Sequence, residues 1–411
     1  MVTTASRRYK DFYDYIPLKD DPRVAGLNNI DPYKYSQNIT SSELAKPIIA
    51  LWKQKLESPF YGITSDGHKK ENLFHLEDEN APTAEINLTD RRKWSNPEFI
   101  IFDVGVRLDQ LSEHERKLVM KLLRSALSKE GYEKVLGAIQ TNAFLGELCE
   151  SRAILNDCSY FVMIFGTPSV TTPWGFAFFG HHTSLNFFFL AKQMTISPVF
   201  IGAEPNIISH GPHKGLEICV REEERGLMFM QSLPQELQAK AQIYKELHDR
   251  EMPADRWNPA DQRHLGGAFQ DNRVIPYEGI LVSTLSLGDQ EALVEVISSF
   301  LEILPHPVLT ARLAQVRRHF DETYFCWIGG YDKEDSFYYR VQSPVICVEF
   351  DHHSGVFLTN SDPKKYHVHT IIRTPNGNDY GREWLRLYRE ANASNDSKMA
   401  NGACTSDRVP V

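Results

Sequence analysis

One stretch of the chain, residues 366–381, reads YHVHTIIRTPNGNDYG. Its first half alternates like a strand, and successive strand residues point to opposite faces of a sheet, so His367 and His369 share one face. Two imidazoles on one face can hold a single metal ion. The Pro-Asn-Gly run at 375–377 predicts a tight turn that brings Asp379 and Tyr380 back toward the strand. This stretch is therefore the predicted centre of an active site.

Two blocks of the chain are rich in aromatic and β-branched residues, which favour strands. The predicted strands are 160–165, 174–179, 184–190 and 197–201 in the first block, and 323–328, 337–341, 345–350 and 366–373 in the second. Helices are predicted between and before the blocks, one of them begun by a capping box at Ser112–Glu115.

Neither block alone has enough strands to close a core. The sequence therefore predicts one α+β catalytic domain over residues 41–390, with helices packed around an aromatic-rich, mostly antiparallel sheet that both blocks build. Residues 1–40 are predicted to form an N-terminal arm. Residues 391–411 contain few apolar side chains, which predicts a disordered tail.

The composition of the 411 residues, 42% hydrophobic and 24% charged, is typical of a globular protein. A net charge of −9 without a Lys/Arg-rich block argues against nucleic-acid binding, and no run of about 18 apolar residues predicts a membrane span. The N-terminus lacks the apolar core of a secretory signal, and the six cysteines form no CxxC pair. We therefore expect a cytoplasmic protein with a small-molecule substrate. Nothing in the sequence indicates an oligomeric state.

A second group of candidate ligands follows the aromatic strand that Trp174 begins. His181 and His182 come directly after Gly180. Because neighbouring residues of an extended chain point to opposite faces, only one of the two can join His367 and His369, and the other would orient it. The choice between them stays open. Trp174 and Asn186, the latter on the predicted face of His182, are candidate substrate-binding residues.

A third group surrounds Glu349, which interrupts a strongly apolar predicted strand. A carboxylate there is not expected to be buried without a cation, a histidine or a metal ion, so Glu349 is a candidate catalytic residue. His352 and His353 precede a Ser-Gly pair and are expected in a surface turn. The role of His264 is left undecided, although its loop-rich segment, residues 252–279, could fold over a cleft.

Several short motifs carry a family resemblance. They are WG at 174–175 with GHH at 180–182, FIGAEP at 200–205, FCWIG at 325–329, FYYR at 337–340, and HVH at 367–369 followed by RTPNGNDYG at 373–381. With these motifs, about residues 110–390 resemble a bacterial and fungal family known only as a domain of unknown function, numbered 3500. The resemblance names no substrate. It implies that the family's motif blocks contain His181, His182, Glu204, Tyr339, Arg340, Glu349, His367, His369, Arg373, Asn378, Asp379 and Tyr380.

The favoured function is a metalloenzyme that acts on a small organic molecule and holds one divalent ion, iron, copper or zinc, with histidine ligands. Arg373 and Arg340 could bind a substrate carboxylate, with Asn378 beside them, while Asp379 and Tyr380 transfer protons. Alternatively, Arg373 pairs with Asp379 and holds the turn.

Three reaction classes fit such a site. We favour an iron- or copper-dependent oxidoreductase. One alternative is a zinc-dependent hydrolase of an ester, lactone or amide. The other is a metal-free isomerase, lyase or dehydratase in which the histidines and Asp379 act as acid and base.

Overall fold

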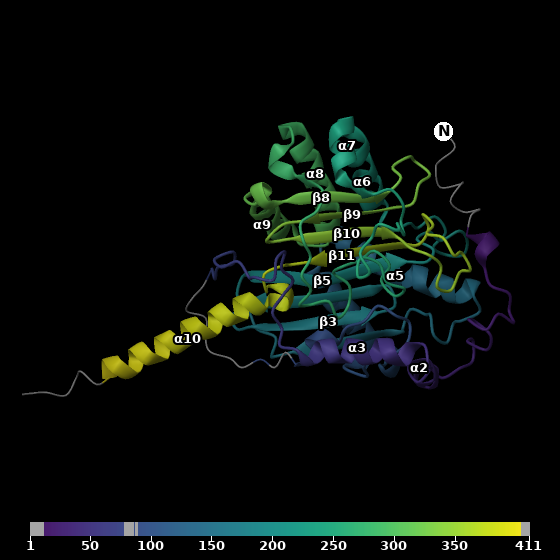
Figure 1. Cartoon of the computed structure of the whole chain (residues 1–411). Coiled ribbons are helices and arrows are strands. Elements are labelled where there is room, and N and C mark those ends of the chain that lie inside the picture. The colour runs from purple at the N-terminus through teal and green to yellow at the C-terminus, as the bar shows by residue number, and fades with distance from the viewer. Residues whose placement is uncertain (1–11, 78–85, 87–88, 404–411) are drawn as a thin grey trace, which may run out of the picture.

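An eleven-stranded sheet organises the fold (Figure 1). The structure is a computed structural model and describes residues 12–77, 86 and 89–403. The strand order is β1-β2-β3-β4-β5-β11-β10-β9-β8-β6, with β7 also paired to β8. All neighbouring strands are antiparallel except β6 and β8. The strands are β1 (Val106–Arg107), β2 (Tyr160–Phe165), β3 (Trp174–Gly180), β4 (Thr183–Leu190), β5 (Gln193–Ala203), β6 (Gln242–Tyr244), β7 (Ile280–Leu281), β8 (Tyr324–Gly329), β9 (Phe337–Gln342), β10 (Cys347–His352) and β11 (Val368–Arg373).

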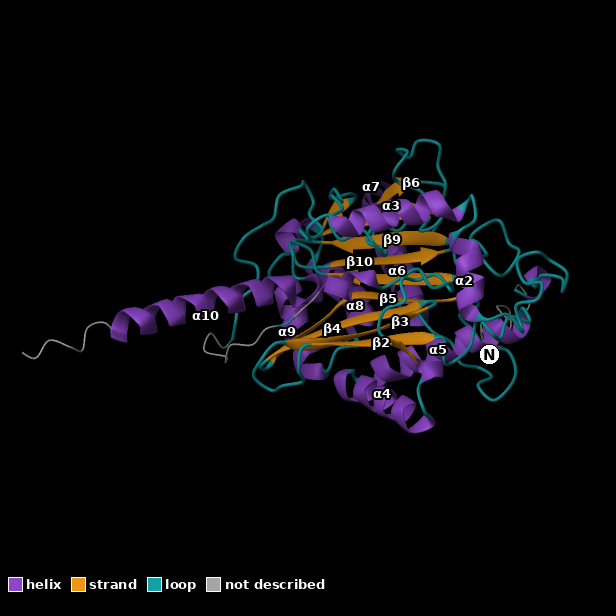
Figure 2. Ribbon diagram, turned by 90° about the horizontal axis from the view of Figure 1, so that it is seen from below, coloured by secondary structure: helices purple, strands orange, loops and turns teal. Residues whose placement is uncertain are grey.

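Helices cover the two faces of this sheet unequally. The helices are α2 (Pro32–Thr40), α3 (Ala45–Glu57), α4 (Glu113–Ala126), α5 (Lys129–Leu148), α6 (Val220–Ser232), α7 (Gln235–Ala241), α8 (Leu287–Leu301), α9 (His306–Arg317) and α10 (Arg382–Ala403). Residues of α4 to α9 build the core on one face, and α3 with the start of α10 packs on the other. Figure 2 shows α3 and α4 on opposite sides of the sheet.

The two strand-rich blocks meet where β5 pairs with β11. Their register places Gly202 opposite His369 and Ala203 opposite Val368. Aromatic rings stack across neighbouring strands in both blocks, for example Phe176 on Phe187, with centroids 4.1 Å apart. This pairing of β5 with β11, the seam between the two strand blocks, confirms the predicted α+β fold. Segments distant in the sequence complete one mostly antiparallel sheet.

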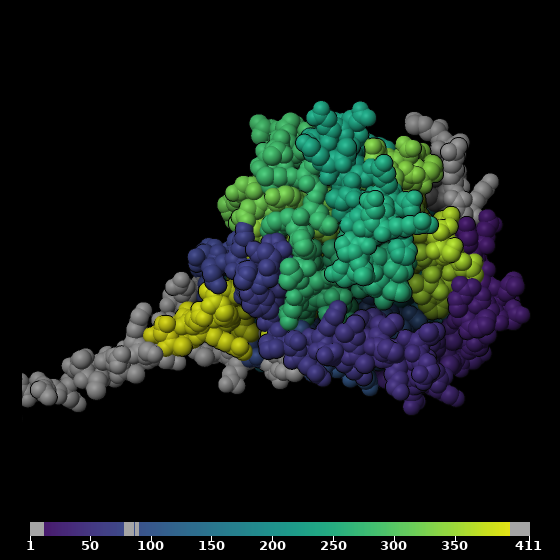
Figure 3. Space-filling model, in the orientation of Figure 1, coloured from purple at the N-terminus to yellow at the C-terminus, as the bar shows by residue number. Residues whose placement is uncertain are grey.

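The face with fewer helices is covered by irregular chain. Residues 252–279 lie over its middle, in teal and green in Figure 3, next to the purple-blue N-terminal residues. The backbone N–H groups of Leu265 and Gly266 donate to the carboxylate of Glu349 on β10, at 2.9 and 2.7 Å. This segment therefore packs on β10 of the sheet, and the prediction that it covers a cleft stays a prediction.

Both chain ends differ from the prediction in part. Residues 391–403 continue α10, so the predicted disorder is wrong there, and residues 404–411 lie outside the described residues. At the N-terminus, residues 1–11 also lie outside, while Phe12, Val24 and Tyr35 of the predicted arm are buried in a small core. None of the described helices is both long and apolar enough to cross a membrane. The five described cysteines are free, as their spacing predicts.

Candidate metal centre

Three histidine rings meet at the seam between the two strand blocks. The Nε2 atom of His367 lies 3.0 Å from that of His369 and 3.3 Å from that of His182, and the third distance is 3.2 Å. All three side chains are almost fully buried, at 0–3% exposure. These are the described residues whose ligand atoms lie close enough together to hold a metal ion.

Local backbone geometry explains why His182, and not His181, joins the group. The two residues form the tight connection between β3 and β4, where Gly180 pairs with Thr183. His182 takes a left-handed conformation (φ 58°), which departs from the strand alternation assumed for an extended chain. The Nδ1 atom of His181 instead lies 2.8 Å from Oδ1 of Asn142 on α5, and its ring stacks on His182 at 3.9 Å. His181 therefore lies beside His182 and outside the group of three.

Burial sets the electrostatics of the three rings. It holds the pKa of His182, His367 and His369 well below the usual imidazole range, and the neighbouring imidazoles lower it further. The rings are therefore neutral, and a neutral imidazole carries one N–H and one lone pair. In the tautomer that carries its N–H on Nδ1, all three Nε2 lone pairs face one another, an arrangement that a cation between them would stabilise.

A glycine on β5 makes the close approach of the rings possible. A Cβ atom at Gly202 would lie 2.6 Å from the Val368 carbonyl oxygen, 2.8 Å from Cδ2 of His369 and 3.2 Å from Cδ2 of His182. The backbone N–H of Gly202 also donates to the carbonyl of His182 at 2.8 Å. Any larger residue would separate β5 from β11 at the histidines.

We therefore expect Gly202→Ala to destabilise the fold by about 1–3 kcal/mol, the usual effect of overpacking, and to weaken metal binding. Urea unfolding and metal titration measure the two effects. Gly288→Ala is the matched control, because the nearest atom to its Cβ is Ser286 Oγ at 3.7 Å. A Gly202→Ala protein that matches the control in both measurements would contradict this role.

Two further histidines lie beside the three rings. His353 has its ring centroid 4.5 Å from that of His369 and 4.9 Å from that of His367. Its Nδ1 lies 2.9 Å from the Ser354 carbonyl, to which it must donate, so Nε2 carries the lone pair and has no hydrogen-bond partner among the described residues. The ring of His264 stacks on His369 at 5.5 Å, and neither of its nitrogens has a described hydrogen-bond partner. Burial lowers the pKa of His353 to about 3 and of His264 to about 4.

The prediction that His352 and His353 lie in a surface turn is wrong, because both are buried. The missed signal is alternation: Glu349, Asp351 and His353 follow the two-residue period of one strand face. The chain after β10 continues to pair with the chain before β11, because the His353 N–H donates to the His367 carbonyl at 2.8 Å. His264 gave no comparable signal, because its position depends on the fold of an irregular segment.

A buried carboxylate lies behind His367. Glu204 accepts backbone N–H bonds from Val356, Phe357 and Leu358 at 2.8–3.1 Å, and its Oε1 lies 3.7 Å from Nδ1 of His367. Burial raises its pKa to about 7, against the lowering effect of the three N–H donors. Carboxylates near the outer nitrogen commonly orient histidine ligands.

The predicted catalytic residues of the turn are engaged in a separate buried network. Arg373 donates to Asp379 at 2.8 Å, to Asp271 at 2.6 Å and to two glycine carbonyls. The hydroxyl of Tyr380 donates to Asp271 at 3.0 Å and accepts from Trp94 at 2.8 Å. All side-chain nitrogens of Arg373 are hydrogen-bonded within the protein, and the side chain is fully buried. These contacts fit the alternative prediction, in which Arg373 holds the turn. The geometry does not support a substrate clamp.

Glu349 and Arg340 lie on neighbouring strands near this network. Glu349 accepts from Tyr338 at 2.6 Å and from two backbone N–H groups. Burial raises its pKa, but His264 and Arg340 more than offset this, so the net pKa is below the usual range. Arg340 donates to Glu278 at 2.7 Å. Both residues are therefore paired within the protein.

The remaining predicted substrate residues lie away from the three rings. Trp174 begins β3, whose other end carries the histidines, and donates to the Ser169 carbonyl at 2.8 Å. Asn186 lies inside the sheet at a register shift and donates to the Pro198 carbonyl at 3.0 Å. Asn378 accepts from the Trp384 N–H at 3.2 Å. The structure does not bring these three together with the histidines.

Comparison with known protein families identifies the family of this chain. A family model described as "Protein of unknown function (DUF3500)" matches residues 70–382. The matched region contains His182, His367 and His369, and it confirms the family resemblance of the sequence motifs. No curated protein and no solved structure matches the chain.

Proposed function

The chain belongs to the DUF3500 family, and we propose that it is a metal-dependent enzyme that acts on a small organic molecule. One divalent ion would be held by His182, His367 and His369. The observation that carries this proposal is the mutual contact of three neutral, buried Nε2 atoms at 3.0–3.3 Å.

The spacing of the three nitrogens suits a metal ion. Metal–imidazole bonds of about 2.0–2.1 Å at angles between octahedral and tetrahedral place the nitrogens about 2.8–3.4 Å apart. Imidazole ligands suit iron, copper and zinc, and a set of three leaves positions for substrate. Among the described residues, no carboxylate lies close enough to the three histidines to bind the same ion.

Within this proposal we favour iron- or copper-dependent oxidation. The support is an analogy from architecture, since β-rich scaffolds that present an HxH pair with a more distant histidine often hold iron or copper. The second candidate is a zinc-dependent hydrolase. It is favoured by His353, whose buried Nε2 has no described partner and could accept a hydrogen bond from a water molecule beside the three rings.

Metal analysis of the purified full-length protein tests the proposal. We expect about one ion per chain by inductively coupled plasma mass spectrometry, because three preformed neutral ligands bind without a folding cost. Iron or copper supports the oxidoreductase, and zinc supports the hydrolase. The control is His68→Gln, an exposed histidine whose loss should not change the content. A metal-free protein that cannot be loaded with any of the three ions would reject the metal centre.

A further inference from the structure

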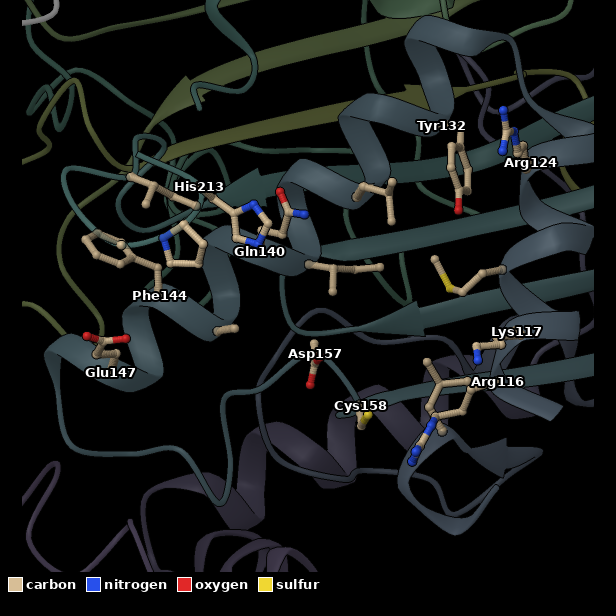
Figure 4. Close-up of a pocket in the computed structure, with 18 of the residues that line it drawn as sticks. Arg116, Lys117, Arg124, Tyr132, Gln140, Phe144, Glu147, Asp157, Cys158 and His213 are labelled. Atoms are coloured by element: carbon tan, nitrogen blue, oxygen red, sulfur yellow. The ribbon is translucent and has the colours of Figure 1, made fainter. Parts of the chain in front are cut away.

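A large pocket lies between α4 and α5 (Figure 4). Its volume is about 720 Å³, within the range of roughly 300–1,000 Å³ that is usual for small-molecule sites. None of the three proposed metal ligands lines it. The pocket is therefore a separate site, for which the metal centre provides no explanation.

One wall of the pocket is cationic. Four basic side chains of α4 line it: Arg116, Lys117, Lys121 and Arg124. Lys117, Lys121 and Arg124 share one side of the helix, since residues three or four apart lie on the same face, and Arg116 lies one residue before Lys117. Such a cluster is unexpected by composition, because the whole chain carries a net charge of −9. A local positive field in an acidic protein attracts anions to this wall.

Two of these cations have no partner among the described residues. Lys117 pairs with Glu113 at 2.6 Å, and Arg124 lies over the ring of Tyr132. The side chains of Arg116 and Lys121, in contrast, have neither an ion pair nor a hydrogen bond among the described residues. These two are available for the charged group of a ligand.

The floor of the pocket is apolar. Ile139 and Phe144 of α5 are buried, at 5% and 6% exposure, and half-buried Met120 completes the surface beneath the basic wall. The cationic wall and the apolar floor thus occupy different parts of one pocket.

Three acidic side chains also line the pocket: Glu113, Glu147 and Asp157. Glu113 pairs with Lys117, and Glu147, beside Phe144 in Figure 4, contacts His210 and Arg152 at 3.4 Å. The pocket lining therefore carries four basic and three acidic side chains, and Arg116 and Lys121 are the basic ones left without a partner in the part of the chain that the structure describes.

We propose that this pocket binds a small amphipathic anion. Its carboxylate or phosphate group binds Arg116 and Lys121, and its apolar body lies over Met120, Ile139 and Phe144. The charge of the wall sets the sign of the head group, and the floor requires an apolar body. The limited volume favours a small molecule over a segment of another protein.

Isothermal titration calorimetry with three probes of equal chain length tests the site. Decanoate and decyl phosphate distinguish the two anionic heads, and decyltrimethylammonium reverses the charge. We expect at least one anion to bind at least tenfold more tightly than the cation. In Arg116→Gln/Lys121→Gln, that anion should bind at least tenfold more weakly, because both free cations are lost.

The matched control is Lys46→Gln/Lys240→Gln, which removes two exposed lysines from α3 and α7 and should leave anion binding unchanged. Melting temperatures establish that both double variants are folded. The proposal would be overturned if decyltrimethylammonium bound as tightly as the anions. It would also be overturned if Arg116→Gln/Lys121→Gln bound the anion as tightly as the wild type. Binding of polyglutamate in place of both anions would overturn it as well and would point to an acidic protein partner. Metal content is expected to be the same in all variants, so this test is independent of the metal centre.

Discussion

Replacing His369 by Gln is expected to lower metal affinity by more than about 100-fold. His369 is one of three rings whose Nε2 atoms meet at 3.0–3.3 Å, and an amide at this position offers a weaker donor atom at a different distance. Loss of residues that only support a ligand already costs about 10–100-fold, and loss of a ligand itself should exceed that. Competition with a coloured chelator measures the affinity. The variant should also lose the rise in melting temperature that metal gives the wild-type protein.

His181→Gln separates the ligand from its neighbour. Because the His181 ring stacks on His182 and contacts Asn142, its loss should weaken metal binding less than loss of His369. His68→Gln, at an exposed position, should bind as the wild type does. If His181→Gln lost the ion while His369→Gln kept it, the assignment of the three ligands would be wrong.

Replacing Arg373 by Lys is expected to destabilise the protein by about 3 kcal/mol without changing metal content. The guanidinium joins Asp379, Asp271 and two glycine carbonyls in a fully buried network. Lysine keeps the charge but lacks the planar fork, so some of these groups lose their donors. Breaking a buried ion pair typically costs about 3–5 kcal/mol. The free energy of unfolding in urea measures the loss.

Arg386→Lys is the control for this change. Arg386 also contacts two carboxylates, those of Glu383 and Glu390, but its side chain is 44% exposed, and exposed pairs contribute little. It should unfold within about 0.5 kcal/mol of the wild type. An Arg373→Lys protein with wild-type stability and weakened substrate binding would restore the substrate-clamp reading.

The sequence predicts well whatever depends on short periodicity. Alternation along residues 366–373 placed His367 and His369 on one face of the sheet. Runs of aromatic and β-branched residues predicted the ends of most strands to within a few residues. The pairing of Arg373 with Asp379 across the turn was also accessible as an alternative, because a chain reversal brings those residues together. In each case the interacting groups are close in sequence.

The sequence predicts less where distant segments decide the outcome. His264 reaches the site only because residues 252–279 fold over the sheet, and β6 is a three-residue strand that exists by pairing with β8. Gly202 matters through the Cβ atom that it lacks, since its neighbours come from β11 and from the β3–β4 turn. Helix α10 lacks an apolar stripe over 391–403, so its continuation could not be inferred from periodicity.

The enclosure of the three rings has a consequence for the timing of metal exchange. With His182, His367 and His369 at most 3% exposed, an ion cannot leave without movement of the chain above them. Release should therefore proceed at the opening rate of the covering segment, and a high chelator concentration should not accelerate it further. An ion acquired while the chain folds would stay until the covering segment opens. The metal found in the purified protein would then record the supply present during synthesis.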